Sequence, residues 1–335
     1  MVNICYFYDY YKTMINNKDI IKGHSSMKMI RAVEEEIAFR YYKDQLMRCP
    51  VHLSIGQEAA AVGVCENLKP SDYILSNHRC HAHYLAKGGD LNSMICEIHG
   101  KANGCVGGRG GSMHLQDDSV NFLGSFPIVG SAIPLAIGVA MNIKRLKKDS
   151  IVVSFLGDGA VEEGSFHESL NFASVFKLPI LFVVENNYFS IQTHIKDRQA
   201  SDDFTRFANS NLIPSVRCDG NNFIDTFSNT KKIIKEVRKS KPYLLQLDTY
   251  RFVEHCGPNS DDHLNYRDNK ELNYWLKKCP ISHIEKFMLK NNIINQEYLI
   301  KLSSKIQKKI IGAFDLAIKS PLPKSKDASK YSYAK

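Results

Sequence analysis

IVVSFLGDGAVEEGSFHESLNFASVFKLPILFVVENN, residues 151–187, is the stretch from which the fold of this chain is predicted. It begins with the apolar run Ile151 to Leu156 and ends with a second apolar run, Pro179 to Val184. The segment between them, Glu162 to Phe176, has the pattern of a helix. Two continuous apolar strands joined through a helix are typical of a parallel sheet that is covered on both faces. The stretch therefore predicts an α/β fold with a doubly wound, mostly parallel sheet.

The segments on either side extend this alternation of helices and strands. Apolar residues recur at helical spacing from Ser26 onward, and Asp90 and Gly100 are a plausible N-cap and stop of a later helix. Further elements are expected as helices over 56–68, 222–239 and 281–319 and as strands over 213–216 and 243–247. Because no repeat or flexible linker interrupts the chain, we predict an N-terminal arm, one domain and a polar, lysine-rich tail, over residues 1–25, 26–320 and 321–335.

The composition excludes several classes of protein. Of the 335 residues, 44% are hydrophobic and 24% are charged, which argues against a collagen, a wholly disordered chain or a membrane bundle. The longest apolar run, residues 128–143, is too short and too interrupted to span a bilayer. The net charge of +9 permits an anionic partner without requiring one, and the lysines of 222–239 lack interleaved aromatic residues. We therefore expect neither a nucleic-acid nor a membrane partner.

The cysteines and the start of the chain bear on its location. Nine cysteines are scattered along the sequence with no C-x-x-C pair, which favours reduced thiols over a disulfide framework or a zinc site. Residues 1–11 lack the basic start and cleavage site of a signal peptide. The expectation is a cytoplasmic location.

Polar residues that could bind a metal and a phosphate follow the two strands of the opening stretch. Gly157 and Asp158 come directly after the first strand, and Asn187 comes after the second. Since ligands sit at the carboxyl ends of parallel strands, Asp158 and Asn187 should lie close together. Their oxygens suit Mg²⁺, which completes its shell with phosphate oxygens and water, and Gly159 and Ala160 open a turn whose N–H groups can hold phosphate. These residues predict a diphosphate-bearing cofactor bridged by Mg²⁺.

This G-D-G-A and E-N-N pair resembles the thiamine diphosphate signature in the alpha subunits of 2-oxo acid dehydrogenase E1 enzymes. Five more segments resemble motifs of that family in the same order along the chain. They are HLSIGQEA at 52–59, HRCH at 78–81, GGRGGSMHL at 107–115, PIVG at 127–130 and TYRFVEH at 249–255. The resemblance covers roughly residues 27–320 and implies a thiamine diphosphate-binding fold.

The resemblance also implies roles for individual residues. The metal ligands would be Asp158, Asn187 and the backbone carbonyl of Phe189. The cofactor-binding residues would be those of the strand end and helix start, those of the histidine–arginine segment, those of the ring-binding segment, and the histidine of the late loop: Gly157, Asp158, Gly159, Ala160, Asn187, His78, Arg79, Pro127, Ile128, Val129 and His255. Pro127 departs from the family, which usually has glycine there, so only its carbonyl could hold the aminopyrimidine.

Three histidines are the catalytic candidates that the resemblance suggests. His52 would act on the substrate side, and His255 would contact the diphosphate and assist acyl transfer. His81 also matches the family, with ordering of its loop as the alternative role. His83 and His114 are expected to be structural.

The implied function is that of an oxidoreductase subunit. It would decarboxylate a 2-oxo acid, with pyruvate the first choice, and pass the acyl unit to a lipoyl acyltransferase. An E1 beta subunit would supply the activating glutamate in an α2β2 heterotetramer, with residues 128–143 as an interface helix or a core helix. Should the isolated chain prove active, Glu58 is the candidate internal carboxylate. The alternatives are an acetoin dehydrogenase alpha subunit, a specialised thiamine diphosphate enzyme of surface-carbohydrate biosynthesis, and a non-catalytic basic interaction subunit, which the intact Asp158/Asn187 pair disfavours.

Overall fold

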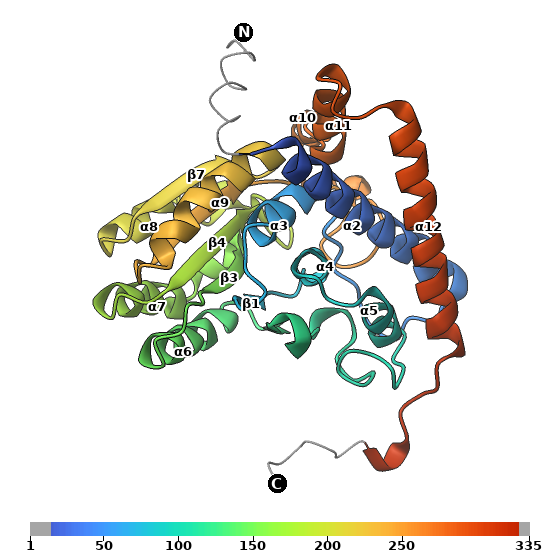
Figure 1. Cartoon of the computed structure of the whole chain (residues 1–335), viewed down its shortest axis with the longest axis horizontal. Helices are drawn as coiled ribbons and strands as arrows, with labels where there is room; N and C mark the ends of the chain where they lie inside the picture. Colours follow the sequence, from blue (N-terminus) through green and yellow to red (C-terminus); the bar gives the residue numbers. More distant parts are fainter. Residues whose placement is uncertain (1–14, 328–335) are drawn as a thin grey trace.

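A twisted sheet of six parallel strands lies at the centre of the computed structural model, which describes residues 15–327 (Figure 1). The strand order is β2-β1-β3-β4-β8-β7, and every neighbouring pair is parallel. The strands are β1 (Tyr73–Ser76), β2 (Phe122–Ser125), β3 (Val152–Gly157), β4 (Ile180–Asn186), β7 (Ser215–Asp219) and β8 (Tyr243–Asp248). The predicted parallel α/β sheet is confirmed, and the two strands of the opening stretch are its central pair.

Helices cover both faces of this sheet. The helices are α2 (Asn17–Asp44), α3 (Glu58–Cys65), α4 (His81–Lys87), α5 (Leu91–Ile98), α6 (Ala132–Arg145), α7 (Gly164–Val175), α8 (Thr205–Ser210), α9 (Phe223–Val237), α10 (Asn269–Lys277), α11 (Pro280–Lys290) and α12 (Gln296–Lys319). Figure 1 shows α6 and α7 together at one side of the sheet and α2, α4 and α5 at the other, with the long helix α12 packed along α2 and α5.

The side chains of the central strands alternate between two apolar cores. In β3, Val153 and Phe155 belong to the core beneath α2, α3, α5 and α12. Val152 and Leu156 belong to the opposite core, beneath α6 and α7. Because both faces are buried, apolar residues occur on both faces of the strand, and its sequence shows no regular polar alternation.

Several elements differ from the prediction. Helix α2 begins at Asn17 rather than at Ser26, because the side chain of Asn16 accepts a hydrogen bond from Asp19 N at 2.9 Å and caps the helix there. Strand β1 and helix α4 were not predicted, since each is too short to show a period. The predicted helical region 281–319 is divided into α11 and α12 by a turn in which Asn292 has a φ of 51°.

The structure describes only part of the predicted arm and part of the predicted tail. Residues 1–14 of the predicted arm and 328–335 of the predicted tail lie outside the described residues. The beginning of the tail lies against residues 102–115, here called the glycine-rich loop, where Ala102 N donates to Pro321 O and Arg109 Nη2 donates to Asp327 O. Within residues 15–327, no helix is both long enough and apolar enough to cross a membrane.

Candidate functional site

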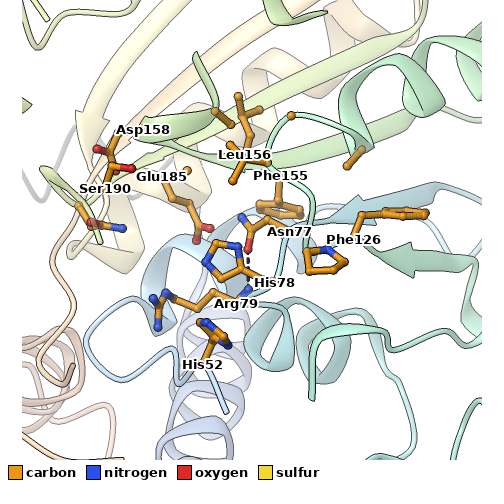
Figure 2. Close-up of a pocket in the computed structure, with 18 of the residues that line it drawn as sticks. His52, Asn77, His78, Arg79, Phe126, Phe155, Leu156, Asp158, Glu185 and Ser190 are labelled. Atoms are coloured by element: carbon orange, nitrogen blue, oxygen red, sulfur yellow. Dashed lines mark hydrogen bonds between the residues drawn. The ribbon is translucent and has the colours of Figure 1, made fainter. Parts of the chain in front are cut away.

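A cavity of about 230 Å³ opens at the carboxyl ends of β1, β3 and β4 (Figure 2). In the central pair of strands, Gly157 lies opposite Glu185, so the residues that follow the two strands emerge side by side. All the site residues predicted from the sequence line this cavity except His81. They are His52, His78, Arg79, Pro127, Ile128, Val129, Gly157, Asp158, Gly159, Ala160, Asn187, Phe189 and His255.

One end of the cavity carries the oxygen donors. Asp158 begins the short 3-10 helix η3 (Asp158–Glu162) directly after β3, and only 1% of its surface is exposed. Its carboxylate accepts a hydrogen bond from the backbone N–H of Asn187 and another from Arg198 Nη2 at 2.5 Å. Asn187 Oδ1 accepts from Phe189 N at 3.2 Å. A carboxylate, an amide oxygen and a backbone carbonyl are donor types that Mg²⁺ binds in proteins.

Burial and charge act on Asp158 in opposite directions. Burial raises the pKa of this carboxyl above its ordinary value, and the guanidinium of Arg198 partly offsets that effect. The ion pair therefore favours the ionised carboxylate, which is the form that binds a cation.

The other end of the cavity carries three imidazoles. The ring centroid of His52 lies 4.8 Å from that of His78 and 5.2 Å from that of His255, and the last two centroids are 5.4 Å apart. The rings come from three remote segments: the loop before α3, the end of β1 and the loop after β8. Backbone pairing fixes two of these segments together, since Gly257 N donates to Val51 O at 2.8 Å.

These imidazoles are held in the neutral form. Burial and the positive charge of Arg79 lower the pKa of His52, His78 and His255 to about 3 each. A neutral imidazole offers one N–H donor and one nitrogen acceptor, so each ring can donate one hydrogen bond and accept another near pH 7. His52 Nδ1 is buried and has no hydrogen-bond partner among the described residues.

Arg79 stands beside the rings as a buried cation. Its Nη1 donates to Leu53 O at 2.6 Å and its Nη2 donates to His255 O at 3.0 Å. Burial and the nearby charge of Arg251 lower its pKa to about 10, so the guanidinium stays charged at neutral pH. A fixed cation with donors to spare is suited to phosphate oxygens.

The remaining wall of the cavity is apolar and open to solvent. Pro127, Ile128 and Val129 form it, and 72% of Ile128 and 49% of Val129 are exposed. Helix α6 continues this surface, because Leu135 and Met141 face outward. The opposite face of α6 is buried in the core, at Ile133, Ala136, Ile137, Ala140 and Ile143. The helix therefore serves as a core helix on one face and leaves an apolar face exposed on the other.

His81 requires a correction to its predicted catalytic role. It is fully buried and does not line the cavity. Its Nδ1 lies 2.6 Å from Glu34 Oε1, and its Nε2 lies 2.8 Å from Ser112 Oγ. Because both ring nitrogens are occupied away from the cavity, His81 is a positioning residue that joins α2 to the glycine-rich loop.

Two charged residues at the site were missed in the sequence. Glu185 lines the cavity, and its Oε1 lies 3.2 Å from His83 Nε2; its place in the E-N-N triplet was the available signal. Arg198 pairs with Asp158, and no motif marks it.

Glu58 does not line the cavity, because it is buried in an ion pair with Arg31 at 2.6 Å. It is therefore unsuited to act there as an internal activating carboxylate.

Comparison with known proteins gives consistent results. The family model described as "Dehydrogenase E1 component" matches residues 25–326. The chain is 32% identical to the testis-specific mitochondrial pyruvate dehydrogenase E1 component subunit alpha of Rattus norvegicus, with 96% of this chain and 81% of the relative covered. It is also 32% identical to the pyruvate dehydrogenase E1 component subunit alpha of Porphyra purpurea, covering 93% and 92% of the two chains. The chloroplastic subunit alpha-3 of Arabidopsis thaliana is 32% identical, with 92% and 73% covered.

Proposed function

The chain belongs to the dehydrogenase E1 component family, and on that premise we propose that it is the alpha subunit of a pyruvate dehydrogenase E1 enzyme. Membership makes it a subunit of a thiamine diphosphate-dependent oxidoreductase that acts on 2-oxo acids and works with an E1 beta partner. Pyruvate as the substrate, Mg²⁺ as the metal and the α2β2 assembly are the finer parts of the proposal.

The observation that carries the proposal is the division of one cavity into complementary ends. Oxygen donors gather at one end, a guanidinium and three imidazoles gather at the other, and an apolar wall lies beside them. A cofactor with an anionic tail, a bound cation and aromatic rings needs all three features in one place. The donor set of Asp158, Asn187 and the Phe189 carbonyl would hold Mg²⁺, and Arg79 and His78 would hold diphosphate oxygens.

When bound, thiamine diphosphate supplies the carbanion-stabilising ring on which 2-oxo acid decarboxylation depends. The residues of this chain supply its placement. Gly159 permits a close approach of η3 to the next segment, because a Cβ there would lie 2.8 Å from Ser190 Oγ. Pro127 has no N–H to donate, so the ring wall contributes a carbonyl and the apolar surfaces of Ile128 and Val129.

The two catalytic candidates differ in what their rings can reach. His52 Nδ1 has no partner among residues 15–327, so we assign to it the hydrogen bond with the substrate oxygen. His255 lies in the loop after β8 and is backed by Arg79, whose Nη2 is 3.5 Å from His255 Nδ1. Since the guanidinium opposes protonation of that nitrogen, His255 is suited to handing a proton on rather than to keeping it.

A second subunit is the natural cover for the open wall. Ile128 and Val129 leave apolar surface exposed beside the cavity, and an exposed apolar patch next to a site is typical of a protein interface. We propose that the E1 beta subunit packs there, supplies the activating carboxylate and excludes water from the site. The lipoyl acyltransferase would then receive the acyl unit from the assembled enzyme.

The similar proteins bear on the choice among the alternative functions. The relatives named above carry pyruvate dehydrogenase in their names, which favours pyruvate over acetoin or a carbohydrate precursor. The assembled cavity argues against a non-catalytic interaction subunit, because such a protein has no need to keep buried charges aligned at its centre.

The deciding experiment compares the purified chain alone with the chain co-expressed with its beta subunit. Decarboxylation of pyruvate, acetoin cleavage and decarboxylation of a branched 2-oxo acid are measured with thiamine diphosphate and Mg²⁺. We expect pyruvate turnover by the pair and none by the isolated chain. Full activity of the isolated chain would contradict the two-subunit proposal and would direct attention to Glu185, the carboxylate beside Asp158 in the cavity lining.

Location is a separate question. The relatives named above include mitochondrial and chloroplastic forms. The cytoplasmic location expected from the sequence stays a proposal, which cell fractionation followed by immunodetection of the chain would test.

A further inference from the structure

Arg198 lies outside every motif and connects the oxygen-donor end of the cavity to the segment that follows the E-N-N triplet. It follows the short 3-10 helix η4 (Ile195–Asp197), and its side chain is 10% exposed. Its Nη2 donates to Asp158 Oδ2 at 2.5 Å and its Nη1 donates to Glu162, so the guanidinium bridges the first and last residues of η3. Its Nε donates to Thr193 O at 3.1 Å.

The segment that Arg198 closes carries the other two candidate metal ligands. Asn187 and Phe189 stand at its beginning. Phe189 also opens a small antiparallel hairpin of β5 (Phe189–Ser190) and β6 (Thr193–His194), which Arg198 follows in the chain. The chain therefore lines the cavity as far as Ile191, turns, and returns to Asp158 through the guanidinium of Arg198.

The backbone of this segment is held in an unfavourable conformation. Tyr188 and Ile191, at either side of β5, have φ angles of 69° and 55°. A positive φ is costly for a residue with a side chain, and most of all for β-branched Ile191. Such a conformation persists only where the surroundings impose it. Arginine contacts do so here, since Arg251 Nη2 donates to Ile191 O and Arg198 Nε donates to Thr193 O.

The ion pair also fixes the carboxylate that it touches. Arg198 donates to Oδ2 of Asp158, and together with the backbone N–H of Asn187 it restricts the orientation of the carboxylate. Partners that orient metal ligands in this way commonly contribute 10- to 100-fold to metal affinity. The positive charge of the guanidinium also repels a bound cation. The anionic diphosphate that accompanies the metal offsets that repulsion, so the orienting effect of Arg198 on Asp158 should outweigh it.

We propose that Arg198 is a positioning residue for the metal site, and that it presents Asp158, Asn187 and the Phe189 carbonyl in one fixed arrangement by closing segment 187–198 onto η3. This inference rests on the proposed function for the identity of the ligands. The closing of the segment is independent of that function, and the two parts are tested separately.

The first test uses the full chain without cofactor. Hydrogen exchange is measured across residues 187–198 in the parent, in Arg198→Gln and in Arg198→Lys. We expect severalfold faster exchange in Arg198→Gln and an intermediate rate in Arg198→Lys, because lysine keeps the charge and loses the two-pronged contact. The matched control is Arg40→Gln, which removes another arginine placed between two carboxylates, Glu36 and Asp44 on α2. Unchanged exchange in both Arg198 variants would overturn the proposal.

The second test titrates Mn²⁺ into the full chain in the presence of thiamine diphosphate and follows free Mn²⁺ by electron paramagnetic resonance. Arg198→Gln should weaken Mn²⁺ binding by about 10- to 100-fold, Arg198→Lys by less, and Arg40→Gln not at all. Equal or tighter binding by Arg198→Gln would overturn the positioning role. Asp158→Asn distinguishes failure of the metal assignment from failure of the positioning role. If this variant too leaves Mn²⁺ binding unchanged, the metal assignment itself fails and the proposal fails with it.

Discussion

The two ends of the cavity are built in different ways. The oxygen-donor end comes from one β-α-β unit, in which Asp158 follows β3 and Asn187 follows the neighbouring strand β4. The imidazole end comes from three segments far apart in the chain, which contribute His52, His78 and His255. A single strand register is enough to form the first end, whereas the second requires the whole fold.

The charge at the two ends differs as well. Asp158 is a buried carboxyl whose ionised form is favoured by Arg198, so this end offers an anionic oxygen ligand to a cation. The three imidazoles are neutral and stand beside the buried cation Arg79, so their end is prepared to receive an anion. Because the two ends are built from different residues, a substitution at one end should leave the other end intact. Four predictions test this, in order from the largest expected effect to the smallest.

Asp158→Asn should have the largest effect, because it removes the anionic ligand and leaves Arg198 without one of its two carboxylate partners. Metal-dependent binding of thiamine diphosphate should weaken by more than about 100-fold, beyond the loss expected for a residue that only orients a ligand. Calorimetric titration at fixed Mg²⁺ measures this, and far-ultraviolet circular dichroism checks the fold. Unchanged affinity would remove the metal assignment from this end of the cavity.

His52→Asn and His255→Asn should leave cofactor binding largely intact and lower turnover by about 10²-fold or more, as expected for groups that handle protons. His255→Asn should reduce acyl transfer to the lipoyl acceptor more than decarboxylation with an artificial electron acceptor. The measurement is kcat in both assays on the assembled enzyme, with His283→Asn on α11, an exposed histidine outside the cavity, as the control. An equal loss in both assays would remove the acyl-transfer role of His255.

The imidazole end should make the cofactor-free chain sensitive to acid. Because the folded pKa of His78 is about 3 and the unfolded value is about 6.5, the unfolded chain binds the extra proton between these limits. Stability should therefore fall as the pH falls from 6.5 toward 3. His78→Phe should reduce the slope of unfolding free energy against pH by about 1 kcal/mol per pH unit in that range. Urea unfolding at several pH values tests this, and identical slopes would mean that His78 is not held neutral by burial.

The smallest effect is expected behind the imidazole end, at the hydrogen bond between Ser112 and His81. Ser112→Ala should cost about 1 kcal/mol of folding stability and change turnover little, because the bond positions a loop and does not touch the cavity. Thermal unfolding and kcat are compared with those of Ser119→Ala, an exposed serine of the same region. A large loss of turnover at unchanged stability would restore a catalytic role to the His81 pair.

Local sequence was sufficient wherever neighbours along the chain are also neighbours in space. The apolar runs of β3 and β4 predicted strands buried on both faces, and parallel pairing then placed Asp158 beside Asn187. Helix α5 was anticipated from its N-cap, since Asp90 Oδ2 accepts from Ser93 N at 2.8 Å. The short elements β1 and α4 escaped prediction, because so few residues cannot display a period that distinguishes strand from helix.

The sequence by itself determined the α/β class, the central strands and, through resemblance to a family, the residues that line the cavity. Only the tertiary structure decided that His81 is buried between Glu34 and Ser112, that Arg198 returns to pair with Asp158, and that the wall of Ile128 and Val129 is open. The physical reason is that strand pairing follows from a periodic pattern of apolar residues. Side-chain partners across remote loops depend instead on how those loops pack, and no local pattern records that packing.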